Sequence, residues 1–567
     1  MSAPDDLLAD LDEQQAAAAR SLRGPLCILA GAGTGKTRTL THRIAYGIAS
    51  GAFTPQRVMA LTFTNRAAGE MRARLSALGV GSVSARTFHS AALAQVNYFW
   101  PTITRSAPPQ VIAGKGAILG HVAEERGVRV DTAILRDVAA QIEWRKVSMI
   151  SLEEYADTYA AARTPASLTT DQLVEMQREY ERLKDERRLI DFEDVLLACA
   201  GMIEVEPSVA LHVREQYRYF LVDEYQDVSP LQHHLLRVWL GQRTDICVVG
   251  DASQTIYSFA GASSHYLTDF PRDFPAATVV RLEDNYRSQP AIVDVANALV
   301  RGQRGALTLR AQTAPLSGDP APSLREFADD RDEVDGVVAA IAAEIAAGRR
   351  PESIAVLFRF NAQSVLWEQG LRERSLAYTV RGSQRFFERP EVRQALLALK
   401  AAGVAASADP LFKTVSDVLR QLGWSMTPPE SAGAVRERWE SLNALISLLD
   451  EMPVGASVRE FSAMLAQRQA DAHEPTMSAV TVSTFHAAKG LEWDSVYLVG
   501  LAEGLLPVSY ATDPESIEEE RRLFYVGITR ARKRLSLSWS RYGEALGARV
   551  MREPSRFLKD IRVPRHP

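Results

Sequence analysis

Short, almost continuous apolar runs recur along the chain, and each ends at a polar or glycine-rich turn. Runs of this length are typical of strands buried on both faces of a parallel sheet. Helical patterns follow most of them, so the alternation of strand, turn and helix predicts an α/β architecture. The runs fall into two sets, residues 26–29, 58–61, 219–222, 247–249 and 279–282, then 354–358, 480–482, 496–499 and 535–537.

Two long stretches between these strands are rich in Ala, Leu, Glu and Arg and predict helices instead. In the second stretch Trp439, Leu442, Leu445 and Leu449 recur at helical spacing, which indicates core packing. We therefore expect two α/β domains, each with a mainly helical insertion. The expected pieces are 1–90 and 206–280 for the first domain, 91–205 for its insertion, 281–392 and 478–560 for the second domain, 393–477 for its insertion, and a tail at 561–567.

The composition is that of a folded multidomain protein. Of 567 residues, 46% are apolar and 24% are charged, whereas disordered chains are far less apolar. The 65 basic and 70 acidic residues argue against a uniformly basic nucleic-acid binder but leave a local basic groove open. The three cysteines, Cys27, Cys199 and Cys247, lie in apolar runs, which indicates buried thiols. Neither a signal peptide nor a long apolar run is visible, so we expect a cytoplasmic protein.

A glycine-rich segment follows the first predicted strand and precedes a helical pattern, as in a P-loop. Its glycines allow backbone N–H groups to approach phosphate oxygens, its lysine supplies positive charge, and its last hydroxyl can ligate Mg²⁺. A plain glycine-rich turn is the alternative, and the flanking strand and helix argue against it. The segment comprises Ala30, Gly31, Ala32, Gly33, Thr34, Gly35, Lys36 and Thr37.

A later apolar run ends in the carboxylates Asp223 and Glu224. Acidic pairs are common at solvated strand ends, so by itself this pair is weak evidence. After a P-loop, however, an acidic pair at a strand end is where Mg²⁺ coordination is needed. Asp223 would hold Mg²⁺ through water, and Glu224 would orient or deprotonate the attacking water.

The P-loop and the segment Asp223-Glu224-Tyr225-Gln226-Asp227, with further motifs in the same order, resemble the UvrD/Rep/PcrA family of superfamily 1 DNA helicases. The resemblance covers nearly the whole chain, with weaker matches in the two helical stretches. It implies two RecA-like P-loop domains, ATP and Mg²⁺ as cofactors, and an ATP site in the cleft between the domains.

The resemblance also implies roles for individual residues. Arg287 and Arg530 would reach the γ-phosphate from the second domain, and such arginines are worth roughly 10³–10⁵ in rate. Gln254 would sense the γ-phosphate. The implied base and sugar contacts are Gln15, which hydrogen-bonds adenine, Arg38 near the nucleotide, Tyr286, which stacks on adenine, and Glu492, which holds the ribose.

A motor on single-stranded DNA needs aromatic platforms and phosphate contacts. The expected DNA-contact residues are Phe63, Thr64, Asn65, Phe88, His89, Tyr257 and Phe259 from the first domain, and Arg359, Asn361 and His486 from the second. Core packing is the alternative for each aromatic. The chain departs from the best-known members at Phe259, where they have Trp, and at Ala260, where they have Arg. Its second insertion is also short for the family.

These features predict an ATP-dependent helicase that moves 3′ to 5′ on single-stranded DNA and acts on 3′-tailed duplexes, as a monomer, in repair or replication. The polarity comes from the resemblance alone. Two alternatives stay open. One is a DNA-stimulated ATPase that translocates and displaces proteins but needs a partner to unwind. The other is a nucleotide-gated DNA-binding module that recruits repair partners.

Overall fold

The computed structural model divides the chain into two compact units, which are described separately. Unit 1 comprises Met1–Arg287 and Gly302–Gln312, and unit 2 comprises Ser288–Arg301 and Thr313–Pro567. The structure describes residues 4–165, 167–315, 321–381, 387, 389–403, 410–427, 429, 434–453, 455–471, 479–545, 548–561, 563 and 565–566.

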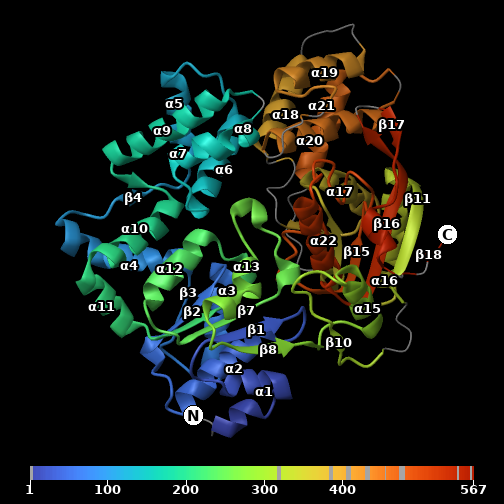
Figure 1. Ribbon diagram of the computed structural model, residues 1–567. Coiled ribbons are helices and arrows are strands. Elements are labelled where there is room, and N and C mark those ends of the chain that lie inside the picture. Colours follow the sequence, from blue (N-terminus) through green and yellow to red (C-terminus); the bar gives the residue numbers. More distant parts are fainter. Residues whose placement is uncertain are drawn as a thin grey trace. The chain divides into compact units, whose positions relative to one another are not determined.

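The centre of unit 1 is a six-stranded, all-parallel sheet (Figure 1) in the order β3-β2-β6-β7-β1-β8. Every run of the first predicted set forms one of these strands. Because the strands are parallel, the P-loop after β1 and Asp223 after β6 lie at the same carboxyl edge. The strands are β1 (Leu26–Ala30), β2 (Val58–Thr62), β3 (Ser84–Thr87), β6 (Tyr219–Val222), β7 (Ile246–Gly250) and β8 (Thr278–Leu282).

Helices cover both faces of this sheet because successive strand residues point to opposite sides. Leu26 and Ile28 of β1 pack with α2 (Lys36–Ala49) and α3 (Asn65–Ala77). Cys27, on the other face, packs with α4 (Phe88–Thr104), α10 (Phe192–Val205) and α12 (Pro230–Leu240). Two-sided burial of the sheet explains the continuous apolar runs in the sequence. All three cysteines are buried and free, as predicted.

The remaining elements of unit 1 are mostly helical. The stretch after α4 contains one short parallel pair, β4 with β5, among its helices. A second short pair, β9 with β10, lies beyond the main sheet. These elements are α1 (Glu13–Arg20), β4 (Gln110–Val111), α5 (Gly116–Glu125), α6 (Thr132–Val147), α7 (Leu152–Glu154), α8 (Ala160–Arg163), α9 (Thr170–Glu186), β5 (Leu189–Ile190), α11 (Pro207–Gln216), α13 (His265–Thr268), α14 (Phe270–Asp273), β9 (Asp284–Asn285) and β10 (Arg310–Ala311).

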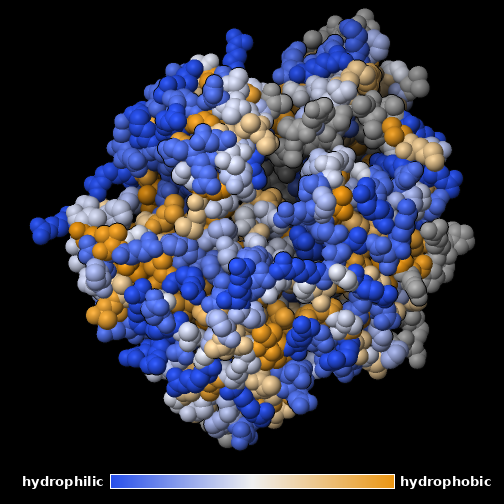
Figure 2. Space-filling model, viewed as in Figure 1, coloured by the Kyte–Doolittle hydropathy of each residue, from blue (hydrophilic) through white to orange (hydrophobic). Residues whose placement is uncertain are grey.

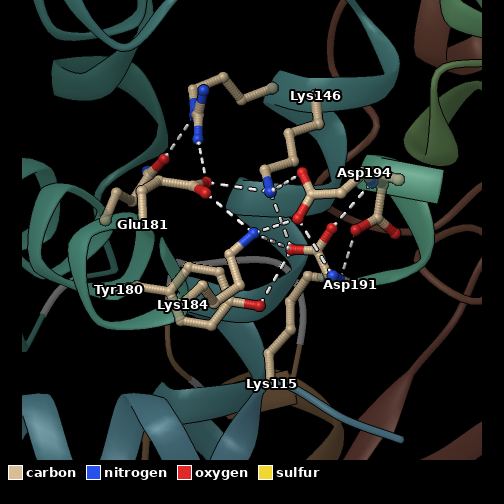
Figure 3. Close-up of polar contacts among 10 residues, drawn as sticks. Lys115, Lys146, Tyr180, Glu181, Lys184, Asp191 and Asp194 are labelled. Carbon is tan, nitrogen blue, oxygen red and sulfur yellow. Dashed lines mark hydrogen bonds and ion pairs between the residues drawn. The ribbon is translucent and has the colours of Figure 1, made fainter. Parts of the chain in front are cut away.

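A buried cluster of charged side chains ties α6, α9 and the start of α10 together (Figure 3). Lys146 of α6 donates to Asp191 at 2.8 Å and to Asp194 at 2.7 Å. Lys184 of α9 pairs with Asp191 at 3.0 Å, with Glu181 at 2.9 Å, and also with Asp194. Two lysines thus hold the turn that starts α10, and we call Lys146, Glu181, Lys184, Asp191 and Asp194 the charge cluster.

Unit 2 is built on an eight-stranded sheet that is parallel except for the pairing of β17 with β16. Its central strands β12, β14 and β15 are buried and pack against α16 and α17. α22 packs against β15, β16 and α15. The elements are α15 (Pro290–Leu299), β11 (Ser323–Asp329), α16 (Asp330–Ala346), β12 (Ile354–Phe358), α17 (Ser364–Glu373), β13 (Tyr378–Arg381), β14 (Val480–Thr484), β15 (Trp493–Leu498), α22 (Pro514–Ile528), β16 (Ala531–Ala545), β17 (Ala548–Met551) and β18 (Arg565–His566).

The described residues of the second predicted insertion form helices, the first of which begins three residues before the predicted boundary at 393. They are α18 (Pro390–Ala402), α19 (Leu411–Gln421), α20 (Ala434–Ser447) and α21 (Val458–Asp471). Trp439, Leu442, Leu445 and Leu449 share one buried apolar cluster, which confirms the predicted core packing. The predicted insertion also spans 404–409, 428, 430–433, 454 and 472–477, which lie outside the described residues, as do 562, 564 and 567 of the tail.

The units differ from the expected domains between residues 281 and 312. The sequence places a boundary between residues 280 and 281, whereas β8 runs to Leu282 inside the first sheet and unit 1 continues to Arg287. Residues 302–312 also belong to unit 1. The predicted α/β class is confirmed, and Arg287 is a residue of the first unit.

Apolar side chains also gather on the outer surface of α4, α10 and α11 (Figure 2), where Tyr98, Val205 and Leu211 are largely exposed. Within the described chain no single helix has the length and apolar character to cross a membrane. The pair α10 and α11, bent by 108° at their junction, meets that test only when counted together.

Candidate nucleotide and DNA sites

The P-loop wraps the end of β1 and leads into α2. Gly33 and Gly35 have φ of +72° and +81°, the left-handed region that favours glycine. The Lys36 ammonium donates to the carbonyls of Ala30 and Gly31, each at 3.2 Å. The lysine charge is therefore held against the loop, at the amino end of a 14-residue helix, which is a suitable place for an anion.

Thr37 and Asp223 meet across the sheet edge, as the P-loop interpretation predicts. The Thr37 hydroxyl lies 3.4 Å from Asp223 Oδ2. Burial, followed by the neighbouring Glu224 carboxylate, raises the pKa of Asp223 to about 7. Glu224 itself has φ of +54°, an unusual backbone conformation for a non-glycine residue. Hydroxyl and carboxylate oxygens are the hard donors that Mg²⁺ prefers, so this pair fits the cation expected from the sequence.

Gln226, which the sequence analysis did not select, joins two predicted motifs. Its Nε2 donates to Glu224 Oε2 at 2.5 Å, and its Oε1 accepts from the backbone N–H of Asp251 at 3.0 Å. Gln254 donates to the Asp251 carboxylate at 2.6 Å. A Cβ at Gly250 would lie only 2.5 Å from Gln226 Oε1, so glycine permits this close approach. Glu224 and Gln254 are thus connected through Gln226 and Asp251.

The segment after β8 lies against the P-loop. Asn285 Nδ2 donates to the Ala32 carbonyl at 2.6 Å, and the Tyr286 N–H donates to the Gly33 carbonyl at 3.0 Å. A Cβ at Gly33 would approach Asn285 Nδ2 to 2.6 Å and Arg287 Cβ to 2.8 Å. The structure therefore brings Tyr286 and Arg287 together with the P-loop inside unit 1.

Gln15 and Arg38 approach the same loop from the N-terminal side. Gln15 Nε2 donates to the Thr34 carbonyl at 3.0 Å, and the side chain is almost fully buried. Arg38 Nη2 donates to the Asp10 carbonyl at 2.8 Å. Gln15, predicted to contact the base, and Arg38, predicted to lie near the nucleotide, are thus both found around the P-loop and the first turn of α2.

Arg530 and Glu492 belong to unit 2 and lie near each other there. The Arg530 guanidinium is buried and donates to the carbonyls of Val526 and Leu491 at 2.9 and 3.1 Å, and to the Thr529 hydroxyl. Glu492, next to Leu491, pairs with Arg532. In this structure the predicted phosphate-contacting arginine is bound to its own unit.

Three of the predicted DNA-contact aromatics form one continuous group on unit 1. Phe63 stacks on Tyr257 with centroids 5.4 Å apart, and Tyr257 meets Phe259 edge-on at 6.1 Å. Phe63 is 42% and Phe259 is 67% exposed, which is high for such large apolar rings. Thr64 and Asn65 follow Phe63 directly, and both are exposed. Thr64 caps α3 by accepting from the Ala67 N–H.

Phe88 is a correction to the predicted DNA-contact set. Its ring is 4% exposed and stacks on Trp239 at 6.0 Å in the core, so it offers no platform to a base. His89, the next residue, is half-buried and meets the ring of Phe192 edge-on at 6.0 Å. Burial, followed by Lys115, lowers the pKa of His89.

Phe192, the partner of His89, is an exposed aromatic that the sequence analysis did not select. It is 51% exposed and begins α10, between carboxylates of the charge cluster. Lys115 adds an ion pair with Glu193, the residue after Phe192, at 2.7 Å. The sequence held no signal for a role of Phe192 in DNA contact, because its acidic neighbours Asp191 and Glu193 would repel phosphate.

The DNA-contact residues predicted in unit 2 follow two strand ends. Arg359, after β12, makes a bidentate pair with Glu520 at 2.9 and 3.1 Å. Asn361 follows, half-exposed, two residues later. His486 lies after the neighbouring strand β14, and burial, followed by Arg359 and Lys489, lowers its pKa to about 3. His486 is therefore neutral at physiological pH, and Arg359 carries a charge already paired with a carboxylate.

Comparisons with known proteins identify the family of the chain. The model of the UvrD/REP helicase N-terminal domain matches residues 11–275, and that of the UvrD-like helicase C-terminal domain matches residues 280–426 and 404–542. The chain is 47% identical to the ATP-dependent DNA helicase UvrD2 of Mycobacterium tuberculosis, over 99% of this chain and 82% of the relative.

More distant relatives match over a similar extent. DNA helicase II of Escherichia coli is 29% identical over 98% of this chain and 88% of its own length. The ATP-dependent DNA helicase PcrA of Staphylococcus aureus is 27% identical over 98% and 86%. The resemblance inferred from the motifs, and with it a fold of two RecA-like domains, is confirmed: the chain belongs to the UvrD/Rep family of DNA helicases.

Proposed function

We propose that this protein is an ATP-driven motor that moves 3′ to 5′ along single-stranded DNA and unwinds 3′-tailed duplexes, as a monomer, in DNA repair or replication inside the cell. The observation that carries the proposal is the meeting of Lys36, Thr37, Asp223 and Glu224 at one sheet edge, with Arg287 beside the same loop. The names of its relatives support the helicase assignment.

In this proposal each residue has a distinct role in phosphoryl transfer. Thr37 and Asp223 hold Mg²⁺, which neutralises phosphate charge when bound. Lys36 contacts the phosphates, and Glu224 orients and deprotonates the attacking water. Arg287 and Arg530 stabilise charge on the γ-phosphate, and Gln254 senses whether that phosphate is present.

The base is bound by residues around the P-loop of unit 1, and the ribose by a residue of unit 2. Gln15 hydrogen-bonds adenine, Tyr286 stacks on it, Arg38 lies alongside, and Glu492 of unit 2 holds the ribose. Two contacts support this role: the Gln15 side chain donates to the Thr34 carbonyl, and the Tyr286 backbone N–H donates to the Gly33 carbonyl, which holds residue 286 beside the P-loop.

The group Phe63, Tyr257 and Phe259 supplies stacking platforms for bases, since aromatic stacking is tolerant of sequence. Its exposure and its continuity support this role. Thr64 and Asn65, at the amino end of α3, contact DNA phosphates. From unit 2, Arg359, Asn361 and His486 complete the contacts.

The test is steady-state ATP hydrolysis with and without single-stranded DNA, at fixed salt, for wild type and Glu224→Gln. We expect strong stimulation by DNA in the wild type and a loss of turnover of at least roughly a hundredfold in the variant, with nucleotide binding retained. Glu186→Gln, on the exposed face of α9, is the matched control. Absence of stimulation in the wild type would contradict a DNA-coupled motor.

A second experiment separates unwinding from translocation. The purified monomer is given duplexes with a 3′ tail, a 5′ tail or blunt ends. Strand separation on the 3′-tailed duplex alone is expected. Translocation without strand separation would instead favour the DNA-stimulated ATPase that needs a partner, and separation from the 5′ tail would refute the polarity.

A further inference from the structure

The carboxylate of Asp12 contacts both the start of α1 and Tyr286, which lies 274 residues further along the chain. Its Oδ1 accepts from the Gln15 N–H at 2.7 Å and so caps α1. Its Oδ2 accepts from the Tyr286 hydroxyl at 2.7 Å. Both partners lie in unit 1, so one half-buried side chain fixes the start of α1 and the orientation of the Tyr286 ring.

Asp12 also helps to fix the amide of Gln15. Gln15 Oε1 accepts from the Asp12 backbone N–H at 3.3 Å, which closes a reciprocal capping box, and Nε2 donates to the Thr34 carbonyl at 3.0 Å. An N–H can only donate and a carbonyl can only accept, so the two partners determine which end of the amide is oxygen. After these bonds, the amide retains one N–H and one oxygen lone pair.

This fixed orientation has a consequence for the choice of purine. Adenine presents the N6 amino donor beside the N7 acceptor, whereas guanine presents two acceptors, O6 and N7. An amide whose remaining groups are one donor and one acceptor matches adenine. Against guanine, its oxygen would face another acceptor. If the amide could rotate, this difference would be lost.

We propose that Asp12 is a positioning residue for adenine selection: its side chain holds the Gln15 amide, through the cap of α1, and the Tyr286 ring in one arrangement beside the P-loop. The inference rests on the proposed ATPase function, because it assigns Gln15 and Tyr286 to the base.

The test compares Asp12→Ala, Asp12→Asn and Tyr286→Phe with wild type, in turnover of ATP and GTP and in displacement of a fluorescent ADP analogue by ADP and GDP. Asp12→Ala is expected to raise KM for ATP and the Kd for ADP roughly five- to tenfold, while GTP and GDP change by less than about twofold. The kcat at saturating ATP is unchanged, because no group near the reacting phosphate is altered.

Asp12→Asn is expected to recover most of the ATP preference, since an asparagine oxygen also caps a helix and accepts from a hydroxyl. Tyr286→Phe keeps the ring and loses only the hydroxyl, so it tests the same link without disturbing α1. Asp131→Ala removes a comparable aspartate cap, from α6, and is the control for a general loss of stability.

An equal change for adenine and guanine nucleotides in Asp12→Ala would overturn the proposal, as would an unchanged preference. Failure of Asp12→Asn to recover selectivity would also overturn it. If the wild type binds ADP more tightly than GDP but does not hydrolyse ATP, the proposed function is wrong. The role of Asp12 is then still tested by the ADP and GDP affinities of the variants.

Discussion

Replacing Lys184 by methionine is expected to destabilise the helical region formed by α6, α9 and α10. The Lys184 side chain is 2% exposed, and its ammonium faces Asp191, Asp194 and Glu181. Methionine fills a similar volume without charge, so packing is nearly retained. What is lost is one of the two lysine charges that compensate the buried carboxylates, while Lys146 and Arg145 remain paired with them.

The expected size follows from burial. Removing one partner of a buried ion pair costs about 3–5 kcal/mol, because the other charge is left uncompensated. The exposed pair of Arg178 with Glu175, on the same helix, is 58% and 35% exposed and is worth about 0–1 kcal/mol. Arg178→Met is therefore the matched control.

The effect is expected to be independent of pH near neutrality. Burial opposes ionisation of Asp191, but the charges of Lys146 and Lys184 outweigh the effect of burial and lower the Asp191 pKa. For Lys184, burial opposes the charged form, but Asp191, Glu181 and Asp194 outweigh it and raise the Lys184 pKa. A carboxyl group whose pKa is lowered by folding stabilises the folded state at pH values above its unfolded pKa of about 3.9. A lysine whose pKa is raised by folding stabilises the folded state at pH values below its unfolded pKa of about 10.4. The contribution is thus constant between about pH 5 and 9 and is lost in stronger acid.

Amide hydrogen exchange of α9 and α10 is the suitable assay, because it reports local opening in a multidomain chain. Lys184→Met should speed exchange there by roughly two to three orders of magnitude at pH 7, and Arg178→Met by less than tenfold. Adding Asp194→Asn should restore part of the protection by removing one excess negative charge. Equal effects of the two single variants would refute the argument from burial.

Three further predictions concern other parts of the chain. Gly33→Ala should weaken ADP binding roughly tenfold or more in a fluorescence competition assay, since its Cβ would lie 2.6 Å from Asn285 Nδ2, whereas Gly51→Ala, with φ of +74° and open space, should bind normally. Burial raises the pKa of Glu333 to about 7, so the folded state retains a proton that the unfolded state releases above about pH 4.3. Thermal unfolding should show stability falling by up to about 1.4 kcal/mol per pH unit from there to pH 7, and Glu333→Gln should flatten the slope. Affinity for single-stranded DNA should fall steeply with salt, and Phe259→Ala should weaken it by about 1–3 kcal/mol at unchanged salt slope, measured by anisotropy.

The central strands of both sheets could be predicted because burial on both faces leaves a continuous apolar run. β2 and β7 are buried at every position, and so are β12 and β14. Edge strands leave a weaker pattern. Every residue of the edge strand β13 is at least partly exposed, and β11, paired with only the short edge strand β18 on one side, buries just Leu324 and Phe327, so neither produces an apolar run.

The candidate site residues could be predicted from local sequence motifs. Contacts between different motifs could not, because they depend on the order of the strands in the sheet. The P-loop and Asp223 could be predicted, since each follows a strand directly. The link from Glu224 through Gln226 to Asp251 needs β6 and β7 to be neighbours, which no pattern in the sequence states. Phe88 was misassigned because a residue at a helix start points inward or outward according to the packing of the helix.

Arg287 shows how a motif can straddle a structural boundary. Asn285 and Tyr286 are hydrogen-bonded to the P-loop, and Arg287 is the last residue of this part of unit 1. Ser288, one residue later, belongs to unit 2, where its hydroxyl donates to the carbonyl of Ala531, the neighbour of Arg530. When domain boundaries are predicted from apolar runs, a domain ends at its last predicted strand. Residues after that strand that are bound to the same unit through polar contacts are then assigned to the wrong domain. The peptide bond between Arg287 and Ser288 is thus a covalent junction between the two units, immediately after residues that are hydrogen-bonded to the P-loop.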